Sequence, residues 1–421
     1  MDPTRRRARR YLATSALAAA NTAYGLKPFR TPGRTNAFSW AAPWLTSELP
    51  MAYLTGRAAI AAALLRGGVL KTRAGKAGLA LDVASAAGLL ELQRRGKQAG
   101  GAVEAALVDG LGPDYRSRIR LPRIPGPDAA TAKTPGALRM LRIRSQFAHD
   151  ADISYGPYGK PNELDIWRRP DLPSDAGAPV LVQVPGGAWI TGNKQGQAYP
   201  LMSHLAERGW VCVSISYRLS PRSTWPDHIV DVKRALAWVK EHIAEYGGDP
   251  NFVAITGGSA GGHLSALAAL SPNDPAFQPG FEEADTSVAA AVPFYGVYDW
   301  TPEGPAADLE DFFLRAGIMK QPYAQAQELY RQASPLHRVG PHAPPFFLLH
   351  GTHDTLVPIE HSRLLTGALR KSSTQPVAYA EVPGGEHAFD VFGSPRATAS
   401  AEAAGRFLGV VYGDWLRQSG S

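Results

Sequence analysis

The sequence predicts an α/β fold with a mostly parallel, doubly wound sheet, preceded by an Ala-rich helical N-terminal extension. Two observations support this prediction. After about residue 150, apolar runs of strand length alternate with segments of helical periodicity, as in a parallel sheet with crossover helices. Before about residue 120, Ala-rich stretches with helical periodicity dominate instead.

Length and composition indicate a globular protein. At roughly 100 to 200 residues per domain, a chain of 421 residues predicts two domains. Hydrophobic residues make up 44% and charged residues 19%, and the 43 glycines and 35 prolines follow no fixed period, which excludes disordered and collagen-like classes. The single cysteine, Cys212, excludes an intramolecular disulfide and a zinc-thiolate site.

The basic charge belongs to the N-terminal third. Residues 1–125 hold 20 Lys and Arg against 7 Asp and Glu, whereas residues 126–421 hold 24 against 30. This asymmetry favours an anionic membrane surface as a partner of the extension, and a solvated basic face explains it equally well. Aromatic residues are sparse there, so no nucleic-acid partner is predicted.

The first residues resemble the start of an export signal, because the uncharged run Tyr11–Leu26 follows five arginines between residues 5 and 10. The run lacks a Leu-rich core, so we expect an amphipathic helix and no cleaved signal. No apolar stretch approaches the roughly 18 residues of a spanning helix. The expected location is cytoplasmic, or peripheral on a membrane or the cell envelope.

The rest of the extension is expected to form helices that break at Gly67-Gly68 and Gly100-Gly101. Their apolar faces pack either on lipid or on the body. Four prolines between residues 121 and 137 indicate a stiff linker. We therefore predict an extension over 1–125 and a linker over 126–140. The α/β domain then covers 141–421, with a cap-like insertion at about 300–345.

The strands of the sheet follow in order. A hairpin is expected around Ile153 to Trp167, and the later strands are Val180–Val184, Val211–Tyr217, Phe252–Thr256, Ala289–Tyr295, Phe346–His350 and Val377–Val382. Ile229, Val232, Leu236, Val239 and Ile243 lie on one face of a predicted helix.

Ser259 is the predicted nucleophile. It lies in Gly257-Gly258-Ser259-Ala260-Gly261, between a buried strand and an Ala- and Leu-rich helix. In this context Gly-x-Ser-x-Gly forms a strained turn that exposes the hydroxyl, because small residues two positions away leave room for it.

A serine needs a base, and the base needs an orienting acid, in the chain order Ser, Asp or Glu, His for sheets of this kind. Asp354 follows the strand Phe346–His350, and His387 follows the strand Val377–Val382. We predict Asp354 as the acid and His387 as the base. Asp390 and Glu386 are rival acids that lie beside the histidine in sequence.

Other histidines are expected to be structural. His350 and His353 flank Asp354 without a third ligand at a recognisable spacing, so no metal is predicted, and His263 is expected to pack near the nucleophile turn. No cofactor is predicted.

The small-residue loop Pro185-Gly186-Gly187-Ala188-Trp189 follows an early strand, where an oxyanion loop is expected. The backbone N–H groups of Gly187, Ala188 and Ala260 are the predicted oxyanion-hole donors.

Together these motifs resemble the hormone-sensitive-lipase-like serine esterases of the α/β-hydrolase fold, over about residues 140–415. The length and basic extension resemble mycobacterial Lip-type carboxylesterases. The resemblance implies hydrolysis of short- to medium-chain carboxyl esters, with a small-molecule or lipid ester as substrate. Pro185 stands where the family has a histidine and Ala188 where it has a glycine. The oxyanion donors are backbone N–H groups, so this change keeps them. The sequence does not identify the side chains that support the loop.

The expected reaction is acyl transfer from Ser259 to water, with activity rising as His387 deprotonates at about pH 6 to 7. An amide or formamide hydrolase would use the same triad and is the alternative. A binding protein without activity would need a damaged triad, and the sequence has an intact one.

Overall fold

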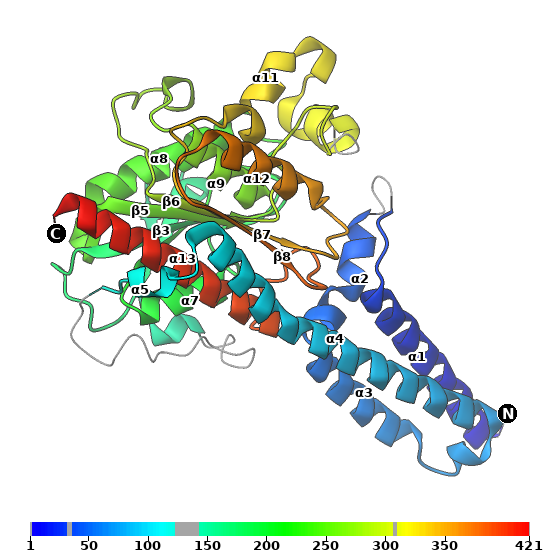
Figure 1. Ribbon diagram of the computed structural model, residues 1–421. Helices are drawn as coiled ribbons and strands as arrows, with labels where there is room; N and C mark the ends of the chain where they lie inside the picture. The colour runs from blue at the N-terminus through cyan, green and yellow to red at the C-terminus, as the bar shows by residue number, and fades with distance from the viewer. Residues whose placement is uncertain (1, 32–35, 123–142, 306–309, 421) are drawn as a thin grey trace.

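The computed structural model describes residues 2–31, 36–122, 143–305 and 310–420 (Figure 1). The linker expected over 126–140 lies outside the described residues.

A mixed sheet forms the centre of the body. Its strand order is β1-β2-β4-β3-β5-β6-β7-β8, antiparallel from β1 through β2 to β4 and parallel elsewhere. The strands are β1 (Ala148–Ser154), β2 (Glu163–Arg168), β3 (Ala178–Val184), β4 (Val211–Ile215), β5 (Gly248–Gly258), β6 (Ala290–Phe294), β7 (Phe346–Gly351) and β8 (Val377–Val382). The predicted strands and hairpin are confirmed.

Helices cover both faces of the sheet (Figure 1). One layer contains α8 (Asp227–His242), α9 (Ala260–Leu270) and α12 (Glu360–Ser372), and the other contains α7 (Tyr199–Glu207), α13 (Pro395–Ser419) and part of α4 (Arg73–Leu111). The predicted helix around residues 229–243 corresponds to α8. The remaining short elements are α5 (Tyr115–Arg118), α11 (Gln327–Gln332), η2 (Val69–Lys71), η4 (Ile143–Gln146), η5 (Lys160–Asn162), η6 (Ile243–Tyr246), η7 (Pro275–Phe277), η8 (Glu310–Met319), η9 (Tyr323–Gln325) and η10 (Pro335–Arg338).

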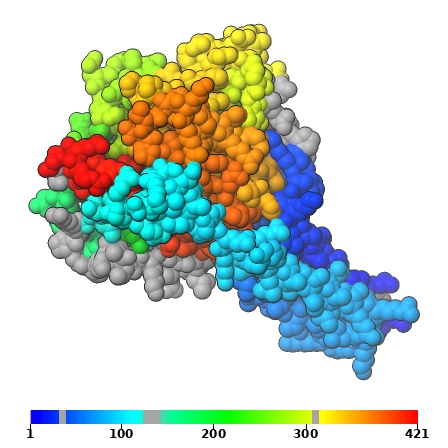
Figure 2. Space-filling view, viewed as in Figure 1, coloured from blue at the N-terminus to red at the C-terminus, as the bar shows by residue number. Residues whose placement is uncertain are grey.

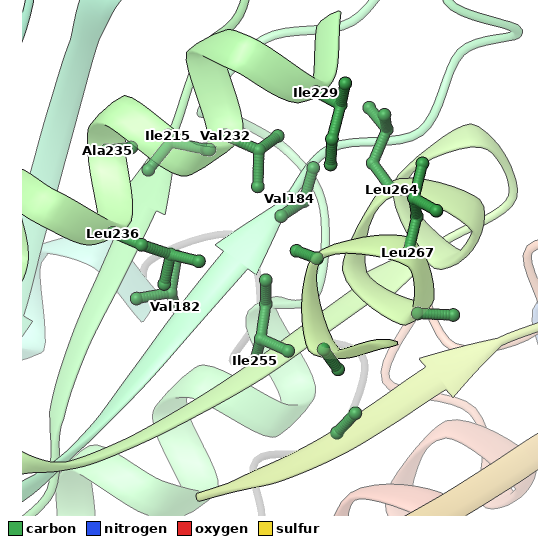
Figure 3. Packing of buried hydrophobic residues seen from close by; sticks show 14 of the residues in the cluster. Val182, Val184, Ile215, Ile229, Val232, Ala235, Leu236, Ile255, Leu264 and Leu267 are labelled. Atoms are coloured by element: carbon green, nitrogen blue, oxygen red, sulfur yellow. The ribbon is translucent and has the colours of Figure 1, made fainter. Parts of the chain in front are cut away.

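Strand side chains alternate between the two layers, because successive residues of a strand point to opposite faces. Val182 and Ile255 pack against α8 and α9 (Figure 3), whereas Leu181 and Ala254 face α7 and α13. Complete burial of a side chain of Val, Leu or Ile size stabilises the fold by about 1.5–3 kcal/mol. The sheet is therefore a rigid platform for the loops at its edge.

The N-terminal helices form an arm that projects from the body (Figures 1 and 2). The arm contains α1 (Pro3–Leu26), α2 (Asn36–Glu48), α3 (Pro50–Leu64) and the first half of α4. Helices α1 and α4 pack closely because glycines of α4 face α1: a Cβ on Gly78 would lie 2.8 Å from the Tyr11 ring.

The second half of α4 belongs to the core of the body. Val103 and Leu107 are fully buried in it, and a Cβ on Gly110 would lie 2.6 Å from Cα of Ala378 in β8. The break expected at Gly67-Gly68 is confirmed by φ values of +68° and +78°. The break expected at Gly100-Gly101 is wrong, since α4 runs through both glycines. Each glycine costs the helix roughly 1 kcal/mol relative to alanine, and the buried contacts on either side outweigh that cost.

The segment between β6 and β7 contains η8, η9, α11 and η10, and it lies at one end of the body (Figure 1). Trp300, Leu314 and Tyr330 bury their side chains in the core. Its description as a cap over the site stays a prediction.

Candidate active site

Ser259 occupies a strained turn between β5 and α9. Its φ of +58° and ψ of −122° lie in a region that residues with a side chain rarely adopt. The flanking glycines permit the turn: a Cβ on Gly261 would lie 2.1 Å from the Val184 carbonyl oxygen, and one on Gly257 would lie 2.4 Å from the Gly261 carbonyl oxygen. The turn places Ser259 at the N-terminus of α9, where the helix dipole favours negative charge.

His387 and Asp354 meet at the carboxyl ends of β8 and β7. Nδ1 of His387 lies 2.7 Å from Oδ2 of Asp354, and both side chains are buried. Parallel strands β7 and β8 pair through Gly351 and Val382, so the loops that follow them emerge side by side. Residues 33 positions apart thereby share one hydrogen bond.

Asp354 is held as an anion by a complete set of donors. Its Oδ1 accepts the N–H groups of Leu356 (2.9 Å) and Val357 (2.7 Å), and its Oδ2 also lies 3.2 Å from Nε2 of His350. Burial by itself would raise the pKa of Asp354, but the neighbouring His387 and His350 hold that pKa well below its usual range. The carboxylate is therefore charged at neutral pH.

His350 has a structural role in this arrangement. Its Nδ1 lies 2.7 Å from Ser362 Oγ, and its Nε2 lies 3.1 Å from the Val357 carbonyl oxygen. Among the described residues there is no group of three or more His, Cys, Asp or Glu side chains arranged to hold a metal ion.

The two rival acids contact other groups. Asp390 accepts a hydrogen bond from the Tyr295 hydroxyl. Glu386 Oε1 accepts the N–H groups of Thr355 (2.7 Å) and His387 (3.0 Å), which ties together the loops that carry the acid and the base. Two effects raise the pKa of Glu386 to about 8: burial, which is the larger, and the negative charge of Asp354.

Tyr295 lies between the serine turn and the histidine. Its ring centroid is 4.7 Å from that of His387, and its hydroxyl would lie 2.7 Å from a Cβ on Gly258. Its φ of +35° is strained. The sequence analysis missed Tyr295, although its place directly after β6 at the same edge of the sheet is a usable signal.

Ser259 and His387 lie at the same edge of the sheet, but in the described structure they share no hydrogen bond. Such bonds are often long without substrate and tighten in the Michaelis complex. The serine turn is also anchored to the next strand, since Ser259 N–H donates to the Phe294 carbonyl at 3.0 Å.

The Gly-rich loop after β3 packs directly on the serine turn. A Cβ on Gly186 would lie 3.2 Å from Cβ of Ser259. Gly187 and Ala188 have φ values of +132° and +52°, which turn the backbone N–H groups away from regular pairing. Within the described residues, the N–H groups of Gly187, Ala188 and Ala260 donate no hydrogen bond and are free to meet a ligand oxygen.

Side chains support this loop although the family's leading histidine is absent. Gln197 Oε1 accepts the Gly186 N–H at 2.7 Å, and Gln197 Nε2 donates to the Gly186 carbonyl at 3.1 Å. The Tyr217 hydroxyl donates to the Pro185 carbonyl at 3.0 Å. Neither contact was predicted from the sequence, because both residues lie outside the loop and no spacing pattern links them to it.

Trp189 anchors the far end of the loop to His263. The indole Nε1 lies 3.2 Å from Nδ1 of His263, whose Nε2 lies 2.7 Å from the Ala333 carbonyl. Burial lowers the pKa of His263 to about 3, so the ring is neutral and accepts from the indole. The expected packing of His263 near the serine turn is confirmed.

Two proteins of Mycobacterium tuberculosis are similar to this chain over most of its length. The chain is 55% identical over 408 residues to the probable carboxylic ester hydrolase LipM of Mycobacterium tuberculosis, with 95% of this chain and 93% of that protein covered. This chain belongs to the family of Lip-type carboxylic ester hydrolases. Esterase LipQ of the same organism is 47% identical to this Lip-type esterase, with 90% of this chain and 86% of LipQ covered.

Two further matches concern the body of this Lip-type esterase. The family model BD-FAE matches residues 164–369. A thermophilic esterase from the Planctomycetes species Thermogutta terrifontis, solved with butyrate bound, superimposes with a TM-score of 0.52 at 27% identity. That match covers 64% of this chain and 94% of the other. The protein therefore has the α/β-hydrolase fold and is a carboxylic ester hydrolase.

Proposed function

We propose that this esterase works through Ser259 as nucleophile, His387 as general base and Asp354 as the group that orients His387. The proposal depends above all on the 2.7 Å contact between Asp354 Oδ2 and His387 Nδ1. That contact fixes the proton on Nδ1 and leaves Nε2 as the basic nitrogen. The strained turn of Ser259 at the same edge of the sheet supplies the hydroxyl.

The reaction follows from these positions. Ser259 Oγ attacks the ester carbonyl carbon while its proton moves to Nε2 of His387, giving a tetrahedral oxyanion. The imidazolium then protonates the leaving alcohol as the C–O bond of the ester breaks. Water attacks the acyl-enzyme with His387 again taking the proton. His387 then returns this proton to Ser259 Oγ as the acyl–oxygen bond breaks and the carboxylic acid is released.

The oxyanion would be held by the free N–H groups of Gly187, Ala188 and Ala260. Donors that are fixed before the reaction stabilise the charge without reorganisation, and removal of one typically costs about 2.7–4 kcal/mol in the barrier. The double hydrogen bond of Gln197 to Gly186 supports this role because it fixes the loop beside Ser259.

The proposed substrates are carboxyl esters of short to medium acyl chain. The Thermogutta esterase, whose structure was solved with butyrate bound, supports a short acyl chain. An amide or formamide substrate is the alternative, since the same triad serves both.

Hydrolysis of a chromogenic ester series of increasing acyl length, with the matched anilides, tests this function. We expect Ser259→Ala to abolish ester turnover and covalent labelling by a fluorophosphonate. Ser265→Ala is the matched control, because Ser265 lies on the same helix and, among the described residues, donates only to the Gly262 carbonyl. Equal ester turnover by wild type and Ser259→Ala would contradict the proposal, and faster anilide than ester turnover would favour the amide hydrolase.

We also propose that the arm attaches the enzyme peripherally to an anionic membrane. Most of the large, exposed hydrophobic side chains in the described structure lie on or beside the arm: Leu17, Phe29, Leu45, Met51, Ile60, Leu70, Leu79, Val83 and Leu90. On α4, Leu79, Val83 and Leu90 lie on one helical face, which would bury apolar area in a lipid headgroup region.

The distal end of the arm is strongly basic. Exposed cations meet there from the start of α1 and from the turn between α3 and α4: Arg5, Arg6, Arg7, Arg9, Arg10, Arg66, Lys71, Arg73 and Lys76. Each cation near an anionic surface contributes about 1 kcal/mol of attraction. In the described part of the chain, no helix is both long and apolar enough to span a bilayer.

Flotation with vesicles of phosphatidylcholine, with and without phosphatidylglycerol, tests the attachment. We expect binding only to the anionic vesicles and its loss in the triple variant Arg66→Glu, Lys71→Glu, Arg73→Glu. The control reverses three exposed cations of the body, Lys160→Glu, Arg222→Glu and Lys371→Glu. Equal binding by both triple variants would remove the proposal.

A further inference from the structure

Helix α2 of the arm lies against the loop that carries His387. Its residues Trp40 and Trp44 are one helical turn apart and so lie on one face. Trp40 Nε1 donates to the His387 carbonyl at 2.8 Å, and Trp44 Nε1 donates to the Ala388 carbonyl at 3.0 Å. Two indole groups of one helix thus hold two consecutive carbonyls of the loop.

These carbonyls need such donors because the loop is irregular at this point. Ala388 has a φ of +61°, so the backbone departs from a regular ladder, and the Ala388 carbonyl has one backbone donor, the Val391 N–H at 3.4 Å. Among the described residues, Trp40 is the only donor to the His387 carbonyl. An unpaired buried carbonyl is costly, so the indole fixes the peptide group that follows the histidine.

The imidazole of His387 is also enclosed by rings. The Trp40 ring stands edge-on to it at a centroid distance of 6.2 Å and an angle of 87°, while Tyr295 lies 4.7 Å away. Trp40 in turn packs on Trp44 at 4.9 Å, and Trp44 packs on Phe392 at 4.7 Å. Helix α2 therefore contacts this loop at His387 and again at Phe392.

A buried ion pair fixes α2 to the body. Glu48, at the end of α2, lies 3.2 Å from Nη1 of Arg396 and accepts a hydrogen bond from Ser394 Oγ at 2.9 Å. Arg396 also donates to the Ser47 carbonyl at 2.9 Å and to the Pro383 carbonyl at 2.8 Å. Since Pro383 and Ser394 bracket His387 in sequence, the pair holds α2 in register with the loop.

We propose that Trp40 and Trp44 are positioning residues for His387, and that helix α2 of the N-terminal arm is part of the active site. The proposal rests on the function proposed above for His387. The two N–H donors set the backbone at His387 and Ala388, and the backbone in turn sets the imidazole against Asp354. A displacement of about 1 Å at such a group can cost 100-fold in rate.

The substitutions Trp40→Phe and Trp44→Phe, singly and together, test the proposal because they remove the N–H donors and keep aromatic rings. We expect each single variant to lower kcat roughly 2- to 10-fold, as for one lost hydrogen bond. The double variant should lose about 100-fold. KM should change little, because both indole N–H groups already donate to loop carbonyls, and the acidic limb of the pH–rate profile should move.

Trp167→Phe is the matched control. Trp167 is almost completely buried, its Nε1 has no hydrogen-bond partner in the described structure, and it lies in β2 away from the site. The same loss of ring volume should lower the free energy of unfolding without moving the pH profile. Thermal unfolding of every variant separates this general effect from positioning.

A second measurement does not depend on turnover. The downfield proton resonance of the His387–Asp354 hydrogen bond should shift or broaden in the double variant and stay unchanged in Trp167→Phe. The proposal would be overturned if the double variant had the kcat, the pH profile and the resonance of the wild type. In that case, loss of turnover in Ser259→Ala would show that the proposed function still stands. Full turnover in Ser259→Ala would instead overturn the proposed function, together with the role given to the tryptophans.

Discussion

Nε1 of Trp189 lies 3.2 Å from Nδ1 of His263, and this contact joins the loop after β3 to helix α9. The same imidazole reaches the Ala333 carbonyl at 2.7 Å and stacks on Trp300 at 4.5 Å. Three segments that are far apart in sequence therefore meet on one neutral histidine. The loop that carries the proposed oxyanion donors is therefore fixed at Trp189 by a contact to helix α9.

We expect His263→Phe to reduce kcat about 10- to 100-fold with little change in KM. The change leaves the buried N–H of Trp189 and the carbonyl of Ala333 unpaired, at about 1–3 kcal/mol each, and it loosens the donors of the oxyanion. Steady-state kinetics with denaturant unfolding provide the measurement. His361→Phe is the control, since His361 is equally buried but lies on α12. A similar kcat for both variants would count against the support role.

Asp354→Asn should reduce kcat about 10⁴-fold, because an amide no longer holds His387 in the tautomer with the proton on Nδ1. Single-turnover kinetics with a short chromogenic ester would show the loss in the chemical step. Asp390→Asn is the comparison, since Asp390 accepts from Tyr295 and does not contact the imidazole. We expect it to cost less than about tenfold. A larger loss of kcat in Asp390→Asn than in Asp354→Asn would assign the orienting role to Asp390 instead.

Glu386→Gln should change how stability depends on pH. In the unfolded chain Glu386 loses its proton near its ordinary pKa of 4.5, whereas burial and Asp354 raise its pKa in the folded protein to about 8. Between these values the folded state binds more protons, so the free energy of unfolding falls as the pH rises. Glutamine carries no such proton, and the decline should flatten.

Urea unfolding at half-unit steps from pH 4.5 to 8.5 measures this slope, which approaches about 1.4 kcal/mol per pH unit in the middle of the window. Asp354 does not contribute to this slope. Its pKa is lowered in the folded protein, so its effect on the free energy of unfolding lies below this pH range. The control is the exposed Glu360→Gln. Parallel curves for wild type and Glu386→Gln would refute the expectation.

Asp82→Ala should loosen the arm selectively. Asp82 accepts from the Tyr11 hydroxyl at 2.7 Å and from Arg57 Nη2 at 2.5 Å, so it joins α1, α3 and α4. Removal of one partner of a mostly buried ion pair costs about 3–5 kcal/mol. Hydrogen exchange should therefore rise across these helices and stay low in the sheet.

The matched control for the arm is Asp109→Ala on the same helix. Its ion pair with Arg370 is exposed on both sides and should contribute less than about 1 kcal/mol. Equal hydrogen exchange in Asp82→Ala and Asp109→Ala would show that the contacts of Asp82 with Tyr11 and Arg57 do not hold the arm together.

Much of the fold was open to prediction from the sequence. The buried strands were predicted because continuous apolar runs bounded by Gly and Pro have few other stable arrangements. Ser259, Asp354 and His387 were identified because each directly follows a predicted strand, and the carboxyl ends of parallel strands share one edge. The continuous helix through Gly100 and Gly101 was not predicted. The low helix propensity of glycine favours a break there, whereas tertiary contacts stabilise the helix.

The sequence by itself determined the sheet, the order of the proposed triad residues and the basic charge of the extension, since all three depend on local patterns along the chain. Only the tertiary structure decided which side chains support the site. Gln197, His263, Trp40 and Trp44 reach their partners across 11 to 347 positions in sequence. No periodicity or spacing records such contacts, because folding and packing bring these residues together only in space.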